Sequence, residues 1–162
     1  MSRLDSFIRR MTAQRDILNS VAEQSLLPPT GDILELGLGN GRTYSHLREL
    51  FPQRRILVFD RVMQAHASSI PDPENLVIGE IDEQAKAYVG HNAAMLHADI
   101  GTGSDAKDAI TLTWLPELVA SLLCVDGVAI SGLPLENAHL SSLPLPDGID
   151  QKRYFLYRKT PS

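Results

Sequence analysis

Three glycines at alternate positions, Gly37, Gly39 and Gly41, follow a short apolar run that carries one carboxylate, Glu35. Glycine lets the backbone take a positive φ and lets a ligand come close to main-chain atoms. A helical pattern begins at Gly41, and the free N–H groups of its first turn would point back at the glycines. The stretch predicts a strand, a tight turn and a helix that cradle a nucleotide-type ligand. A turn that only packs the helix on the strand is the alternative.

The glycine spacing separates two classes of ligand. A dinucleotide fingerprint is G-x-G-x-x-G, and its third glycine would fall on Arg42. Here the third glycine comes one residue earlier, at Gly41, and Glu35 lies two residues before the first. The pattern E-x-G-x-G-x-G resembles motif I of the class I S-adenosylmethionine (SAM)-dependent methyltransferases. The chain is most similar to the short stand-alone bacterial members of that family, which have no added substrate domain.

A second acid, Asp60, ends a predicted strand over residues 55–60 and lies nineteen positions after Gly41. In a βαβ unit of this kind, an acid about 20 residues beyond the glycines bonds the ribose hydroxyls. A carboxylate offers two acceptors to two vicinal hydroxyls, so this position suits SAM and NAD alike. A strand-end acid that caps the next helix is the alternative.

A third predicted strand, over residues 75–81, ends in Gly79, Glu80 and Ile81. This segment resembles the G-D-(apolar) segment beside adenine in the methyltransferases, with Glu in place of the usual Asp. The resemblance implies that the acid and a nearby amide meet the base while the apolar side chain covers its face.

Asp99 ends a fourth predicted strand, over residues 93–100. Its position resembles motif IV of the family, which faces the transferred methyl group. Asp99 is therefore the first candidate to orient or deprotonate the acceptor. His97 lies on the same face of an ideal strand and could assist, although a core or surface histidine is the alternative.

The resemblance implies SAM as the cofactor and divides its site among these segments. Residues 37–41 would wrap the methionine part with Glu35 near its amino group, Asp60 would hold the ribose, and Glu80 with Ile81 would hold the adenine. The whole predicted cofactor-binding set is Glu35, Gly37, Leu38, Gly39, Asn40, Gly41, Arg42, Thr43, Asp60, Arg61, Gly79, Glu80, Ile81 and Asp99.

Strand and helix patterns alternate along the chain, which predicts a doubly wound, mostly parallel Rossmann-like sheet in a three-layer α/β/α arrangement. Every crossover is expected to contain a helix, as right-handed winding requires. The predicted parallel strands cover residues 33–36, 55–60, 75–81, 93–100 and 128–131. The predicted helices of this core cover residues 41–51, 62–69, 82–92, 105–112 and 115–123.

Two further segments complete the expected fold. Residues 140–145 and 153–158 are expected to pair as an antiparallel hairpin through a turn at 146–148, which makes a seven-stranded sheet. Residues 1–30 form an N-terminal flank to the 31–159 core, with an amphipathic helix over residues 3–25. The apolar stripe of this helix is Leu4, Phe7, Ile8, Met11, Leu18 and Val21, and Arg10, Gln14 or Arg15 could face a ligand or simply face solvent.

The composition bounds the kind of protein. A chain of 162 residues predicts one domain over 1–162. The formal net charge of -5 and the lack of a basic run disfavour a nucleic-acid partner. Charged residues near the N-terminus exclude a signal peptide, no stretch is long enough to span a membrane, and the histidines show no metal-ligand spacing. We expect a cytoplasmic protein without a metal that acts on a small-molecule acceptor, with a homo-oligomer possible at the sheet edge.

Two other functions fit parts of the pattern. One is an NAD(P)-dependent oxidoreductase on a similar sheet, against which Arg42 and the lack of a Tyr-x-x-x-Lys pair both count. The other is a non-catalytic SAM-binding module, which the short C-terminal region leaves open.

Overall fold

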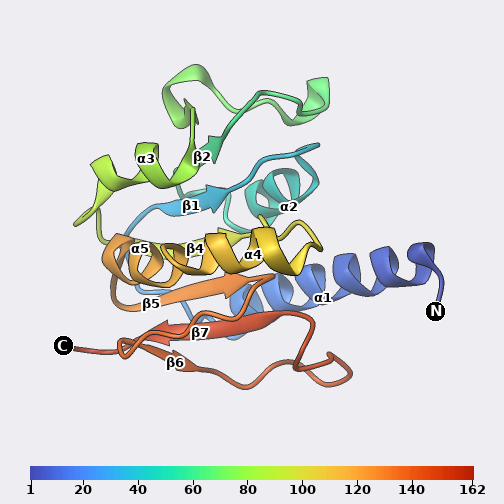
Figure 1. Cartoon of the computed structure of the whole chain (residues 1–162). Coiled ribbons are helices and arrows are strands. Elements are labelled where there is room, and N and C mark those ends of the chain that lie inside the picture. Colours follow the sequence, from blue (N-terminus) through green and yellow to red (C-terminus); the bar gives the residue numbers. More distant parts are fainter.

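Seven strands form one sheet in the order β3-β2-β1-β4-β5-β7-β6 in a computed structural model that describes residues 1–162 (Figure 1). The first five strands pair in parallel, and β7 runs antiparallel to both β5 and β6. The expected doubly wound sheet with its C-terminal antiparallel hairpin is confirmed. The strands are β1 Ile33–Leu36, β2 Ile56–Asp60, β3 Leu76–Ile78, β4 Ala93–Ala98, β5 Leu123–Ser131, β6 Leu140–Ser142 and β7 Phe155–Lys159.

The central strands are buried on both faces, which explains their continuous apolar sequence. Successive residues of a strand point to opposite faces of the sheet, so β1 places Leu34 in one core cluster and Ile33 in the other. Helices α3 and α5 cover the first face, while α1 and α2 cover the second. The three-layer α/β/α arrangement is thus present. The helices are α1 Arg3–Glu23, α2 Arg42–Leu50, α3 Ile81–Ala85, α4 Asp105–Leu112 and α5 Leu115–Leu122.

The connection from β2 to β3 differs from the expected one. It contains two short 3₁₀ turns, Ala67–Ser69 and Pro73–Asn75, so the prediction of a helix over 62–69 is wrong. Prolines 71 and 73 leave little room for a helix after residue 66. The backbone N–H of His66 instead donates to the carbonyl of Asn40 at 2.9 Å, which ties this connection to the glycine turn.

Two other boundaries move. The third strand is shorter than predicted because Gly79, with φ of 146°, ends it, and Ile81 begins α3. The helix predicted over 82–92 is the short α3 followed by a 3₁₀ turn over Lys86–Tyr88. Gly90 and Asn92, both at positive φ, then turn the chain into β4.

Helix α1 begins where expected and ends at Glu23 rather than residue 25, and only its second half is buried in the core. Ala13, Ile17, Leu18 and Val21 are buried, whereas Leu4, Phe7 and Ile8 are 66%, 42% and 52% exposed. In Figure 1 the first turns of α1 reach beyond the end of the sheet, where no strand lies beneath them. The predicted apolar stripe is therefore wrong for the first turns of the helix.

The C-terminal hairpin has shorter strands and a longer connection than predicted. Prolines 144 and 146 follow β6, and proline cannot donate to a strand ladder. The segment between β6 and β7 places Tyr154 in the core and Arg153 against the carbonyl of Ser6 in α1. None of the helices has the length and apolar character that crossing a bilayer requires.

Candidate active site

The three glycines of the turn after β1 have three different reasons to be glycine. A Cβ on Gly37 would lie 2.8 Å from Ile100 Cγ2, and one on Gly41 would lie 2.6 Å from Ser69 Cβ. Those two positions therefore allow close packing against the neighbouring loops. Gly39, with φ of 52°, has nothing within 4 Å of where its Cβ would be. Its surroundings are open space, which is what a position facing a ligand requires.

Asp60 at the end of β2 organises this turn. Its Oδ2 accepts hydrogen bonds from the backbone N–H groups of Leu38 at 2.8 Å and Gly39 at 2.9 Å, and its Oδ1 accepts from the N–H of Arg61 at 2.6 Å. An ionised carboxylate has about four lone-pair positions. Three of them hold main-chain groups, which leaves one for a ligand hydroxyl.

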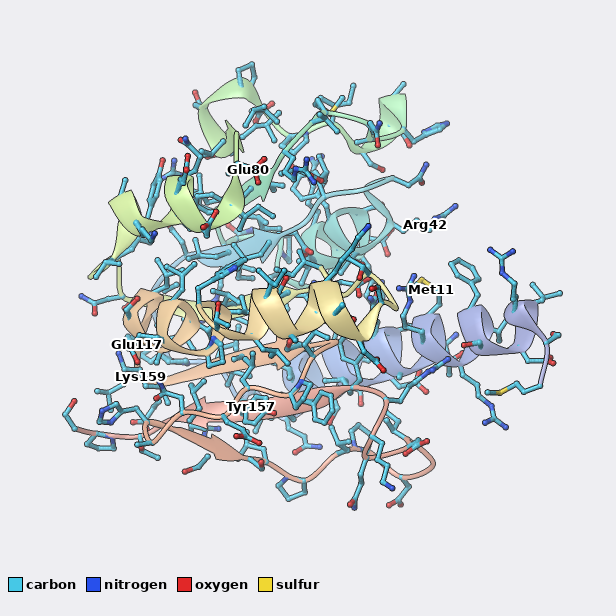
Figure 2. All side chains as sticks on the ribbon, in the orientation of Figure 1. Met11, Arg42, Glu80, Glu117, Tyr157 and Lys159 are labelled. Atoms are coloured by element: carbon cyan, nitrogen blue, oxygen red, sulfur yellow. The ribbon has the colours of Figure 1, made fainter.

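The turn, Asp60 and α1 enclose a cleft of about 410 Å³ at the carboxyl ends of the parallel strands, which we call the cofactor cleft. Figure 2 shows Met11 on α1 near Arg42 at the start of α2, on the side where β1 ends. Crevices at this end of an open α/β sheet are where such folds bind ligands. The cleft is lined by Phe7, Arg10, Met11, Gln14, Gly37, Leu38, Gly39, Asn40, Gly41, Arg42, Thr43, Asp60, Arg61, Ile81, Asp99 and Ile100.

Gln14 of α1 binds Asp99, which directly follows the C-terminal end of β4. The side-chain amide of Gln14 donates to Asp99 Oδ2 at 2.5 Å, and its carbonyl accepts from Thr43 Oγ1 at 3.0 Å. Arg10 Nη1 lies 3.9 Å from Asp99 Oδ1. A Cβ on Gly132, after β5, would lie 3.2 Å from the same Oδ1, so that residue lets the carboxylate sit against the loop. The carboxylate is thereby held by α1 and lies against the loop after β5.

A chain of buried polar groups runs behind Asp99. His97 Nδ1 is hydrogen-bonded to Glu35 Oε1 at 2.7 Å, and His97 Nε2 lies 2.7 Å from the hydroxyl of Tyr154. All three side chains are buried, and the rings of His97 and Tyr154 stack. Glu35 Oε2 is buried with no partner. Since the strand face that carries Glu35 and His97 packs under α1, these groups lie behind the cleft wall.

Burial and mutual charge set the protonation of this chain. Burial raises the pKa of Glu35, with His97 opposing the rise. Burial alone would lower the pKa of His97, but the charge and hydrogen bond of Glu35 outweigh it and raise that pKa. Burial raises the pKa of Tyr154 well above its usual value, and the Asp99 and Glu35 carboxylates add to the rise. The Glu35–His97 pair thus keeps a proton to higher pH than a free histidine, and Tyr154 keeps its hydroxyl proton.

The structure brings most of the predicted site residues together. The cofactor cleft contains Gly37, Leu38, Gly39, Asn40, Gly41, Arg42, Thr43, Asp60, Arg61, Ile81 and Asp99. Gly79 does not line the cleft and packs on Gln84. Glu80 is 58% exposed and pairs with Arg61 Nε at 3.2 Å, outside the cleft wall.

Two predicted site residues do not line the cofactor cleft. Glu35 is 1% exposed and bonded to His97, and it is not among the residues that line the cleft. His97 is fully buried and cannot touch an acceptor. Both side chains lie on a strand face covered by α1, which the strand pattern alone could not show.

The prediction missed several residues of the site. Phe7, Met11 and Ile100 line the cleft, and Tyr154 ends the buried polar chain. Of the three polar residues considered on α1, Arg10 and Gln14 face the cofactor cleft, whereas Arg15 pairs with Asp16. The sequence around Tyr154 holds no sign of its partner, because the contact with His97 spans 57 positions of the chain.

The residues of the cofactor cleft fit SAM. Gly39 offers space for a ligand against the backbone, Asp60 keeps one lone-pair position for a hydroxyl, and Asp60 with Asp99 puts two carboxylates near a cationic ligand. The N-terminus of α2 opens on the same turn. No group of three or more His, Cys, Asp or Glu side chains is arranged to hold a metal ion.

Fold and cleft together define a class I methyltransferase, and comparison with known proteins gives the family. Residues 1–159 match a family described as S-adenosyl-L-methionine methyltransferase. The chain is 37% identical to a solved S-adenosyl-L-methionine methyl transferase from Silicibacter pomeroyi DSS-3, with a TM-score of 0.88 over 98% of this chain and 99% of that chain. The protein therefore belongs to the SAM methyltransferase family, and its cofactor is SAM.

More distant structures share the fold alone. Human methyltransferase-like protein 13, solved with S-adenosylhomocysteine (SAH), is 14% identical with a TM-score of 0.57 over 95% of this chain and 80% of that chain. A Podospora anserina methyltransferase with bound SAH is 13% identical with a TM-score of 0.60 over 99% and 80%. A comparison with curated proteins gives no significant match. The family assignment replaces the alternative of an NAD(P)-dependent oxidoreductase.

Proposed function

We propose that this enzyme transfers the methyl group of SAM to a small-molecule acceptor that binds beside Asp99. The observation that carries the proposal is a second cleft of about 680 Å³, which we call the acceptor cleft. It shares Phe7, Arg10 and Asp99 with the cofactor cleft. Asp99 thus stands where two adjoining spaces meet, as a residue between a methyl donor and its acceptor must.

The chain's own residues would hold SAM through its backbone and two side chains. The main chain of residues 37–41 and the start of α2 would bind the methionine part, and Asp60 would take one ribose hydroxyl at its free lone-pair position. Ile81 would cover the adenine face. Glu80 and Arg61 would close the rim as an ion pair.

The reaction asks for positioning more than for charge stabilisation. SAM supplies a methyl group on a cationic sulfur, and that positive charge is neutralised as the methyl leaves. No oxyanion hole is needed, and holding acceptor and donor in line can supply much of the acceleration. Asp99 would accept the proton of an oxygen or nitrogen acceptor at Oδ1, since Gln14 occupies Oδ2. Arg10 Nη1 lies 3.9 Å from Asp99 Oδ1.

The size and charge of the protein support a small acceptor. The acceptor cleft is bounded by α1 on one side and by the loops after β4 and β5 on the other. A formal net charge of -5 disfavours the polyanionic surface of a nucleic acid as the partner.

Transfer of a labelled methyl group tests the proposal. The enzyme is incubated with SAM labelled in the methyl group and a bacterial cell extract, which is then separated into small molecules, nucleic acid and protein. We expect the label among the small molecules, and Asp99→Asn to reduce it strongly while SAH still binds. Label only in macromolecules would contradict the proposed acceptor class, and SAH binding without any transfer would point to a non-catalytic module.

A further inference from the structure

We infer that the acceptor is an anionic small molecule, whose carboxylate or phosphate group binds the cationic wall of the acceptor cleft. This inference rests on the proposed function and names the chemistry of its acceptor. The cationic wall consists of Arg3 from the start of α1 and Lys152 and Arg153 from the segment before β7. Arg10 lies at the boundary with the cofactor cleft.

None of the three residues of this wall makes an ion pair within the protein. No carboxylate oxygen lies within 4.0 Å of a charged nitrogen of Arg3, Lys152 or Arg153, whereas Arg15, Arg55 and Arg61 each have one. Lys152 and Arg3 are exposed at the cleft. Unpaired cations from two distant segments thus meet in one cleft of an acidic protein.

Arg153 is hydrogen-bonded only to neutral groups. Its Nη2 donates to the carbonyl of Ser6 at 2.6 Å and to the hydroxyl of Ser6, both of which are neutral. Its Nε is buried and has no hydrogen-bond partner. A half-buried guanidinium bonded only to neutral groups keeps its full charge, and a carboxylate or phosphate is the group that best balances it.

Two of the three acids of the same cleft already have partners. Asp108 Oδ1 accepts from the N–H and the hydroxyl of Thr102 at 2.8 and 2.9 Å. Asp99 is held by Gln14 and Arg10. Asp105 lies in the first turn of α4. The cleft therefore has a polarity: Asp99 at the methyl end and the cationic wall beyond it.

This polarity orients an acceptor. A molecule that carries an anionic group at one end and a nucleophilic oxygen or nitrogen at the other would place the anion on Lys152 and Arg3 and the nucleophile on Asp99. An acceptor with a positive charge would meet the unpaired cations and be disfavoured.

A matched pair of probes tests the charge preference. The SAH-bound enzyme is titrated with para-hydroxybenzoate, with the neutral para-hydroxybenzamide and with inorganic phosphate, and binding is followed by the NMR signals of the Gly101 and Gly132 amides. We expect both anions to bind and the benzoate to bind about tenfold more tightly than the benzamide, because a charge-assisted contact is lost in the amide. The ratio between benzoate and phosphate affinity separates carboxylate from phosphate acceptors.

Variants that remove positive charges test whether the cationic wall causes the preference for anions. The double variant Arg3→Gln/Lys152→Gln removes two exposed cations of the cleft, whereas Arg9→Gln/Lys107→Gln removes two exposed cations elsewhere. We expect the first to weaken benzoate binding about tenfold and the second to leave it unchanged. SAH affinity, measured by calorimetry, should be the same in both.

The outcomes separate the inference from the function on which it rests. Equal affinity for benzoate and benzamide, no binding of any anion, or equal effects of the two double variants would overturn the inference while SAH binding and methyl transfer persisted. Failure of the wild-type enzyme to bind SAH would instead overturn the proposed cofactor site.

Discussion

At the scale of residues, the spacing of the three glycines indicated a turn but not the task of each glycine. Gly37 and Gly41 are glycine because neighbouring loops leave no room for a Cβ, while Gly39 is open. For Asp60, the spacing predicted a position at the end of β2. It did not predict that the carboxylate accepts hydrogen bonds from the N–H groups of Leu38 and Gly39. Such contacts depend on how the turn folds back on β2.

Gly39→Val should abolish SAH binding and leave the protein folded. Nothing lies within 4 Å of the new Cβ, so the side chain extends into the space of the ligand, and its positive φ costs about 1–2 kcal/mol of folding stability. Gly90→Val is the matched control, because Gly90 also has positive φ and open surroundings but lies away from the cleft. Calorimetric titration with SAH and urea unfolding check both variants. Undiminished SAH affinity in Gly39→Val would contradict the placement of the ligand against the turn.

The Glu35–His97 pair should make stability depend on pH. The raised pKa of His97 contributes stability that is fully present below about 6.5, its ordinary value, and is lost as pH rises through the raised value. Relative to the Glu35→Gln/His97→Gln variant, the wild-type protein should lose stability across that window, with a slope of at most about 1.4 kcal/mol per pH unit for one proton. Urea unfolding across this range and an NMR titration of the His97 ring provide the check. A pH-independent difference, with an ordinary His97 pKa, would show that the pair does not share a proton.

At the scale of elements, the periodicity of α1 correctly predicted a helix but not what lies beneath each of its turns. A sequence stripe gives the apolar face of a helix, whereas burial also needs a sheet or helix opposite it. The second half of α1 packs on the sheet, and the first half forms a wall of both clefts. Gln14 also contributes to the site, because its side chain is hydrogen-bonded to Asp99 after β4 and to Thr43 in α2.

Substitutions in the two halves of α1 should differ sharply in cost. Leu4→Ser/Ile8→Ser should change the free energy of unfolding by about 0.5 kcal/mol or less, because both side chains are mostly exposed. Ile17→Ala should cost about 2–5 kcal/mol, since Ile17 is fully buried. Urea unfolding at two protein concentrations measures both. A large, concentration-dependent loss in the Leu4/Ile8 variant would mean that a second copy covers this face.

At the scale of the whole molecule, the mostly parallel sheet was predictable because strand and helix patterns alternate and right-handed crossovers allow few arrangements. The β2–β3 connection escaped that rule, since two 3₁₀ turns replace its helix. The cleft residues next to the glycine turn and at strand ends were predicted from the sequence. Tyr154, the cationic wall and the contact of Gln14 with Asp99 were not, because α1 and the segment before β7 reach the site only after the chain has folded.

The central claim is that one cleft at the carboxyl ends of β1, β2 and β4 binds SAM with Asp99 at the methyl end. A crystal structure of the enzyme with SAH tests it most directly. The account predicts the ribose on Asp60, the amino-acid part along residues 37–41 beside Gly39, and the sulfur directed toward Asp99 and the acceptor cleft. SAH bound elsewhere, or with its sulfur turned away from Asp99, would contradict the account.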